Sequence, residues 1–101
     1  PIFSSRKALS RAGISAQELD VIEINEAFAT QSIASIRDLE LDTAKVNIDG
    51  GAIAIGHPLG ATGARITGKA AQVLQREGGR YALSTQCIGG GQGAAGLFER
   101  A

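Results

Sequence analysis

The sequence predicts an α/β fold in which helices are layered on a mixed sheet. Segments with the apolar spacing of amphipathic helices alternate along the chain with short runs typical of strands. Near the end, the glycines of residues 89–91 predict a tight turn between two such runs, which closes the fold as a hairpin. No internal repeat, low-complexity tract or proline-rich linker divides the 101 residues, so we interpret them as one unit.

The first predicted element is a helix over residues 3–12. It would end at Gly13, because glycine favours the left-handed conformation that terminates helices. Ser15 and Glu18 then have the spacing of a capping box and predict a single helical turn. One face of the first helix carries its apolar side chains, Ala8, Leu9 and Ala12.

A strand and a second helix follow. Residues 21–24 form a β-branched run around one glutamate, which suits a short strand. Residues 27–39 predict a helix that packs by one face, because apolar residues recur there at helical spacing: Ala29, Ile33 and Ile36.

The second half of the chain begins with another short strand candidate, residues 45–48. A glycine-rich loop over residues 50–60 then leads into a long helix at 61–77. That helix has four apolar residues on one side: Ile66, Ala70, Val73 and Leu74.

Two final strands, at residues 81–85 and 93–99, complete the prediction. The resulting sheet of four short strands would leave an edge that needs cover.

Composition and charge exclude several classes of function. The chain has 10 Lys and Arg against 10 Asp and Glu, so it lacks the basic excess that binds nucleic acid or an anionic membrane. Its longest apolar run, residues 52–55, is far shorter than the about 20 residues that span a bilayer. With no visible targeting segment, we expect a soluble, cytoplasmic protein without nucleic-acid or membrane partners.

Residues 91–96 match the dinucleotide fingerprint G-x-G-x-x-G, but their context does not. That motif requires a helix after it and an acidic residue about 20 positions further on, whereas five residues follow Gly96. We therefore interpret these glycines as a turn and strand that approach a neighbour closely. We expect no metal site.

His57, the only histidine, lies in the glycine-rich loop just before a predicted helix. A lone histidine is more often an inert surface residue, but Gly56, Gly60 and Gly63 permit a backbone path that a specific site would need. The positive end of the helix favours a neutral ring, which can accept a proton or donate a hydrogen bond to an oxyanion.

Two further candidates lie where strands are expected to end. Cys87 follows a predicted strand beside the turn of Gly89, where backbone N–H groups can serve as oxyanion donors; the ordinary alternative is a small buried side chain. Asn25 joins a strand to a helix, and it could be a helix N-cap or a functional amide.

In this order, the segments that hold these residues resemble the thiolases, which cleave or form 3-ketoacyl-CoA thioesters. The likeness spans nearly the whole chain and rests on three long motifs: Asn-Glu-Ala-Phe-Ala at 25–29, Asn-Ile-Asp-Gly-Gly-Ala-Ile-Ala-Ile-Gly-His-Pro-Leu-Gly at 47–60 with Gly-Ala-Arg at 63–65, and Cys-Ile-Gly-Gly-Gly-Gln-Gly at 87–93.

The resemblance implies a thiolase-like α-β-α fold and a role for each site residue. His57 would activate a nucleophilic cysteine and contribute to an oxyanion hole, and Cys87 would move a proton at the acetyl α-carbon. Asn25 would hold a water in one oxyanion hole, and the Gly89 N–H would donate in a second. Ala27 and Phe28 would line the acyl pocket. Coenzyme A would be a substrate, with no resident cofactor.

The sequence departs from the family in one respect. A thiolase uses two cysteines, and the single cysteine here matches the second one. We therefore expect residues 1–101 to be most of a C-terminal thiolase domain, without its first strand and without the N-terminal half. The partners would be acyl-CoA, CoA and the remainder of the chain, in a homodimer or homotetramer. Alone, the segment should be inactive and should not fold independently.

Two other interpretations remain open at this point. Cys87 could itself be a nucleophile activated by His57, which would make the chain a small thioesterase or cysteine hydrolase. Alternatively, the chain could be a non-catalytic assembly module with a thiolase-like scaffold.

Overall fold

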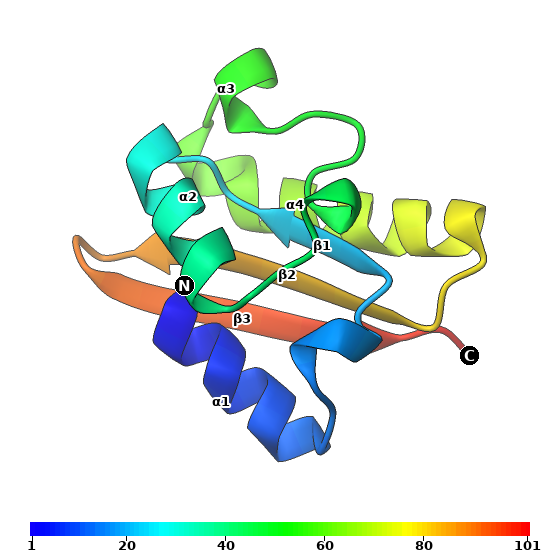
Figure 1. The fold of residues 1–101 in the computed structure, drawn as a ribbon. Helices are drawn as coiled ribbons and strands as arrows, with labels where there is room; N and C mark the ends of the chain where they lie inside the picture. Colours follow the sequence, from blue (N-terminus) through cyan, green and yellow to red (C-terminus); the bar gives the residue numbers. More distant parts are fainter.

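The structure, a computed structural model, describes all residues 1–101. Helix α1 (Ile2–Ala12) leads through a short turn, η1 (Ala16–Glu18), into strand β1 (Val21–Ile24). The middle of the chain forms α2 (Ala29–Asp38), a turn η2 (Thr43–Lys45), α3 (Ala52–Ile55) and α4 (Leu59–Glu77). Strands β2 (Tyr81–Ile88) and β3 (Gln92–Glu99) end the fold (Figure 1).

The three strands form one mixed sheet in the order β1-β2-β3. Strand β1 pairs parallel to β2, and β2 pairs antiparallel to β3 through the hairpin turn. The predicted α/β class, mixed sheet and closing hairpin are confirmed. Residues 91–96 belong to that turn and to β3, with no helix after them, so they lack the context of a dinucleotide fingerprint.

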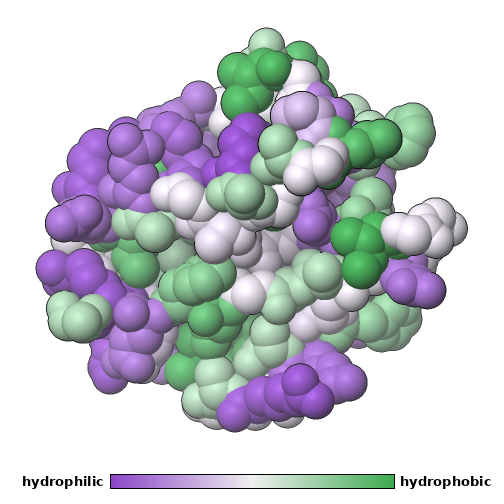
Figure 2. Space-filling model, turned by 180° about the vertical axis from the view of Figure 1, so that it is seen from behind, coloured by the Kyte–Doolittle hydropathy of each residue, from purple (hydrophilic) through white to green (hydrophobic).

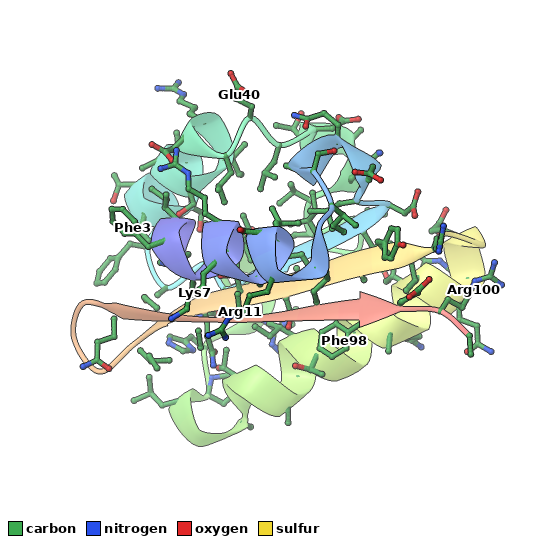
Figure 3. The ribbon with its side chains drawn as sticks, turned by 90° about the horizontal axis from the view of Figure 1, so that it is seen from below. Phe3, Lys7, Arg11, Glu40, Phe98 and Arg100 are labelled. Atoms are coloured by element: carbon green, nitrogen blue, oxygen red, sulfur yellow. The ribbon has the colours of Figure 1, made fainter.

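Helices cover both faces of the sheet. Helix α1 lies on one face and α4 on the other, as Figures 1 and 3 show from two directions. Alternate residues of β1 therefore enter two cores. The core on the α1 face contains Leu9, Leu19, Ile22, Ile24, Leu39, Leu41 and Leu83. The core on the α4 face contains Val21, Ala70, Val73, Leu74 and Ala82.

The prediction of a strand at residues 45–48 is wrong. Only Val46 makes a parallel bridge, to Ile22, and the next residue, Asn47, has a left-handed φ of 47° that turns the chain away. The Asn47 side chain continues the pairing instead: its Oδ1 accepts from the Ile24 N–H and its Nδ2 donates to the Ile24 carbonyl, both at 2.9 Å. The Asn47 amide thus takes the place of a strand residue opposite Ile24 at the outer edge of β1.

Helix α2 packs by only one of the three residues predicted for its buried face, Ile36, which is half-buried against the core on the α1 face. It begins at Ala29 rather than 27, and Ala29 and Ile33 are exposed. The buried side chains are Ser32 and Ser35, and the Ser35 hydroxyl donates to the Gln31 carbonyl at 2.8 Å. The Ser35 hydroxyl is satisfied within the helix, which lets this serine be buried, whereas the Ser32 hydroxyl is buried without a partner.

The ends of the other helices agree more closely with the sequence. Gly13 and Gly78 have left-handed φ angles of 70° and 69° and terminate α1 and α4. Helix α4 starts at Leu59, two residues before its predicted start, and its buried face includes all four predicted residues. Helix α1 buries Leu9 as expected, together with Ser5, whereas Ala12 is exposed. No helix has the length and apolar character needed to cross a membrane.

Candidate active site

The candidate site lies where the parallel strands β1 and β2 end, which is the usual position of sites in open α/β sheets. Asn25 directly follows β1, Cys87 is the second-last residue of β2, and His57 precedes α4. A pocket of about 740 Å³ opens there. It is lined by Ala27, Phe28, His57, Leu59, Gln86, Cys87, Ile88 and the glycines 89–91.

Asn25 is fully buried and directs its side-chain amide toward His57. Its backbone N–H donates to the Thr85 carbonyl at 2.9 Å, so it is locked to the neighbouring strand. Its Nδ2 lies 3.3 Å from His57 Nε2, and its Oδ1 is buried without a partner. Helix α2 begins four residues later, with Phe28 in the N-cap position, which excludes the alternative that Asn25 caps the helix.

His57 is held by the first turn of α4. Its Nδ1 lies 2.7 Å from Thr62 Oγ1, and the Thr62 hydroxyl donates its one proton to the Pro58 carbonyl at 3.0 Å. Thr62 can therefore only accept from the ring, so Nδ1 carries the proton and the lone pair lies on Nε2. This tautomer turns the basic nitrogen of His57 toward Asn25 and makes it available as a proton acceptor.

Cys87 lies within β2, two residues beyond the predicted end of that strand. It pairs with Gly93 across the hairpin and is half-buried. A Cβ on Gly93 would overlap Ser4 of α1, so only glycine lets α1 press against the hairpin at this point. The turn itself needs glycine, because residues 89–91 have φ angles of 58°, 76° and 144°.

Part of the pocket wall is apolar. Ala27 lines it, and Phe28 and Leu59 are 72% and 81% exposed, which is unusual for side chains of this size. Beside the pocket, α3 carries the exposed Ile53 and Ile55. Figure 2 shows strongly hydrophobic side chains at the end of the molecule where α3 stands, and hydrophilic ones over the opposite end of α4. Phe3 also points away from the sheet (Figure 3).

Three features of the site escaped the sequence analysis. Thr62 could have been found from the sequence, because it lies five residues after His57 and its hydroxyl falls in the first turn of the helix that follows the loop. Glu26 lies within the first motif, and its carboxylate accepts a hydrogen bond from the Ile53 backbone N–H. Glu23 interrupts an otherwise apolar strand; it is 1% exposed, and burial raises the pKa of its carboxyl to about 7 although the Arg65 guanidinium opposes the shift. The carboxylate oxygens of Glu23 and the guanidinium nitrogens of Arg65 have no hydrogen-bond partner.

Comparison with known proteins assigns this arrangement to a family. Residues 1–100 match the family described as the C-terminal domain of thiolase, and the chain belongs to that family. It is 58% identical over 100 residues to the β-ketothiolase BktB of Cupriavidus necator. It is 50% identical over 99 residues to the mitochondrial 3-ketoacyl-CoA thiolase of Homo sapiens.

The fold agrees with a solved structure of this family. The crystal structure of human mitochondrial 3-ketoacyl-CoA thiolase in complex with CoA matches all of this chain with a TM-score of 0.97 and 48% identity. The predicted thiolase-like fold is thereby confirmed. The match to the Cupriavidus necator protein covers 99% of this chain but only 25% of that protein. The match to the human structure covers 26% of the human chain.

Proposed function

We propose that this chain forms the C-terminal part of a CoA-dependent acyltransferase of the thiolase type. The enzyme would cleave a 3-ketoacyl-CoA with CoA, or condense two acetyl-CoA molecules in the reverse Claisen direction. The observation that carries the proposal is the 3.3 Å approach of Asn25 Nδ2 to His57 Nε2 at a pocket that Cys87 also lines. Relatives that are named as thiolases support the class of reaction.

The roles follow from the protons and charges of the reaction. A cysteine outside this chain would attack the ketone carbonyl after His57 Nε2 accepts its thiol proton. The bond between the carbonyl carbon and the α-carbon then breaks, and its electrons pass to the departing acetyl-CoA as an enolate. Cys87 would protonate that α-carbon, leaving an acyl-enzyme and a Cys87 thiolate. The CoA thiol would give its proton to Cys87 and attack the acyl group, and the nucleophilic cysteine would leave and take its proton back from His57. In the reverse direction Cys87 would remove the same proton.

The remaining groups would stabilise charge and hold the acyl chain. The buried amide of Asn25 lies against His57, which lines the pocket, and Gly89 lines the pocket as well. The Asn25 amide and the Gly89 N–H would each donate toward an oxyanion, directly or through water. Ala27 and Phe28 would contact the acyl group. Coenzyme A would enter as a substrate, and none of these steps requires a resident cofactor.

The exposed apolar side chains support a larger assembly. Three large side chains are each more than 70% exposed: Phe3, Phe28 and Leu59. Burial of one such side chain stabilises a folded or assembled protein by about 1.5–3 kcal/mol. We propose that the remainder of a thiolase chain covers this surface and supplies the nucleophile. Assembly as a homodimer or homotetramer, cytoplasmic location, and the absence here of the first strand of the domain stay predictions.

A chimera would test the proposal. These residues would replace the matching quarter of the Cupriavidus necator β-ketothiolase, with folding and assembly checked by circular dichroism and size exclusion. We expect CoA-dependent cleavage of acetoacetyl-CoA that His57→Ala and Cys87→Ala each reduce by more than about 100-fold. A folded chimera that lacks this activity would contradict the proposal, and hydrolysis of acyl-CoA through an acyl-Cys87 adduct would favour a thioesterase.

A further inference from the structure

We propose that Glu26 is a positioning residue that fixes His57 relative to Asn25. The inference rests on the function proposed above, and it adds a residue to which the sequence motifs gave no role. Glu26 directly follows Asn25 in the chain, while its side chain reaches the segment that ends at His57. Glu26 therefore links the segment that carries Asn25 to the segment that carries His57.

The carboxylate of Glu26 bridges two donors, one just before the glycine-rich loop and one within it. Its Oε1 accepts from Asn47 Nδ2 at 2.9 Å, and Asn47 is itself hydrogen-bonded to the backbone of Ile24 in β1. Its Oε2 accepts from the backbone N–H of Ile53 in α3, also at 2.9 Å. One carboxylate thus ties both ends of the segment 47–53 to the end of β1. Hydrogen bonds to an ionised carboxylate are among the stronger ones in proteins.

Gly51 shows that this contact has a specific fit. A Cβ at Gly51 would overlap the Glu26 carboxylate and push it off its two donors. The backbone of Gly51 is extended, with φ −126° and ψ −162°, so glycine is not required there by conformation. The absence of a side chain at Gly51 is explained by the space that Glu26 occupies.

Within this chain, little else holds α3 in place. The helix has four residues, which is too short to be stable alone. Ile53 and Ile55 are 68% and 61% exposed, and Ala52 is its only buried residue. Because His57 follows α3 after a single glycine, loss of the Ile53 hydrogen bond should loosen the approach to His57. A displacement of about 1 Å at a catalytic group can lower a rate by about 100-fold.

The test compares Glu26→Gln with a matched control in the full-length protein that contains this chain. The glutamine presents one acceptor and one donor, so it must lose one of the two hydrogen bonds. Glu18→Gln is the control, because Glu18 also accepts a backbone N–H, from Ser15 at 2.7 Å, in a turn away from the pocket. The measurements are kcat and KM for thiolysis, the melting temperature, and amide hydrogen exchange of residues 53–56.

We expect Glu26→Gln to lower kcat by about 10-fold to 100-fold, with KM and the melting temperature unchanged. Exchange of the amides at 53–56 should accelerate by about 10-fold. Glu18→Gln should change neither kcat nor the exchange of the amides at 53–56. An unchanged kcat in Glu26→Gln would overturn the inference, as would a loss of kcat that only accompanies a lower melting temperature.

A double-mutant cycle supplies an independent test. Gly51→Ala should reproduce the loss of kcat in the wild-type background, because it displaces Glu26. In a Glu26→Ala background the same substitution should have no further effect, since no carboxylate remains to be displaced. Additive losses would overturn the inference. If the wild-type protein lacks thiolysis, the proposed function fails instead, and the exchange of residues 53–56 still decides whether Glu26 holds the loop.

Discussion

One carboxylate precedes β1 and another follows it, and the hydrogen bonds that they accept have different consequences. Asp20, before the strand, accepts from the N–H groups of Arg80 and Tyr81 at 2.7 and 3.0 Å and anchors the start of β2. Glu26, after the strand, accepts from Asn47 and Ile53 and anchors the loop of His57. The same hydrogen-bonding device thus holds the fold at one end of the sheet and the candidate site at the other.

The two ends also differ in how completely their polar groups are satisfied. At the Asp20 end, charges are paired with backbone donors or with each other, as in the ion pair of Arg80 and Glu99. At the site end, the buried Asn25 Oδ1 has no partner. Unsatisfied groups of this kind lower stability, and they are retained where function needs them. We therefore expect substitutions at the two ends to separate activity from stability.

Asn25→Ala should show the largest effect on activity. Removing an oxyanion donor lowers kcat by about 100-fold to 1,000-fold. The melting temperature should stay the same or rise, because the substitution also removes an unpartnered buried oxygen. Steady-state kinetics and thermal unfolding of the full-length protein check both. A large loss of stability would show that Asn25 belongs to the scaffold rather than the site.

Asp20→Ala should give the opposite pattern. Two backbone N–H groups lose their acceptor, which should lower the free energy of unfolding by about 1–2 kcal/mol while kcat is unchanged. These hydrogen bonds hold the pKa of the Asp20 carboxyl below its usual value, so its contribution is present above the unfolded pKa and is lost as pH falls through the folded pKa. The variant should therefore lose less stability on acidification than the wild type. A drop in kcat at full stability would contradict the comparison.

Thr62→Val tests the tautomer of His57 with little change of shape. Without the Thr62 oxygen, the Nδ1 proton has no acceptor at 2.7 Å, and the ring can rotate or change tautomer. We expect kcat to fall by about 10-fold. Thr62→Ser keeps the hydroxyl and should retain most of the activity. Equal rates for the valine and serine variants would exclude a role for this hydroxyl.

Glu23→Gln should have the smallest effect, on the pH dependence of stability. Burial raises the pKa of Glu23 to about 7, so its favourable contribution is complete below its unfolded pKa and is lost as pH rises through 7. Glutamine does not ionise, so the variant should lose about 2–4 °C less in melting temperature between pH 5 and pH 8. Identical pH profiles would show that Glu23 is not buried in the assembled protein.

The sequence predicted what depends on local pattern and on whole motifs. Strand β1, helix α4 and the hairpin follow from apolar periodicity and glycine turns. The three motifs hold Asn25, which lies against His57, and Cys87, which lines the same pocket as His57. The local pattern predicted a strand at residues 45–48 that does not form, because the side chain of Asn47, rather than a strand backbone, pairs with the edge of β1.

Burial was misjudged for a related reason. In α2, Ser32 and Ser35 are buried and Ile33 is exposed, and the Ser35 hydroxyl is satisfied by the Gln31 carbonyl within the helix. The contacts of Thr62 and Glu26 are set by tertiary geometry, which periodicity does not encode.

Trapping the acyl-enzyme would show which cysteine is the nucleophile. The full-length protein would be mixed with acetoacetyl-CoA without free CoA, quenched in acid, digested, and mapped by mass spectrometry. We expect an acetyl group on a cysteine outside residues 1–101, with Cys87 unmodified, and loss of the adduct in His57→Ala. An acetyl group on Cys87 would contradict its assignment as the acid and base of the reaction.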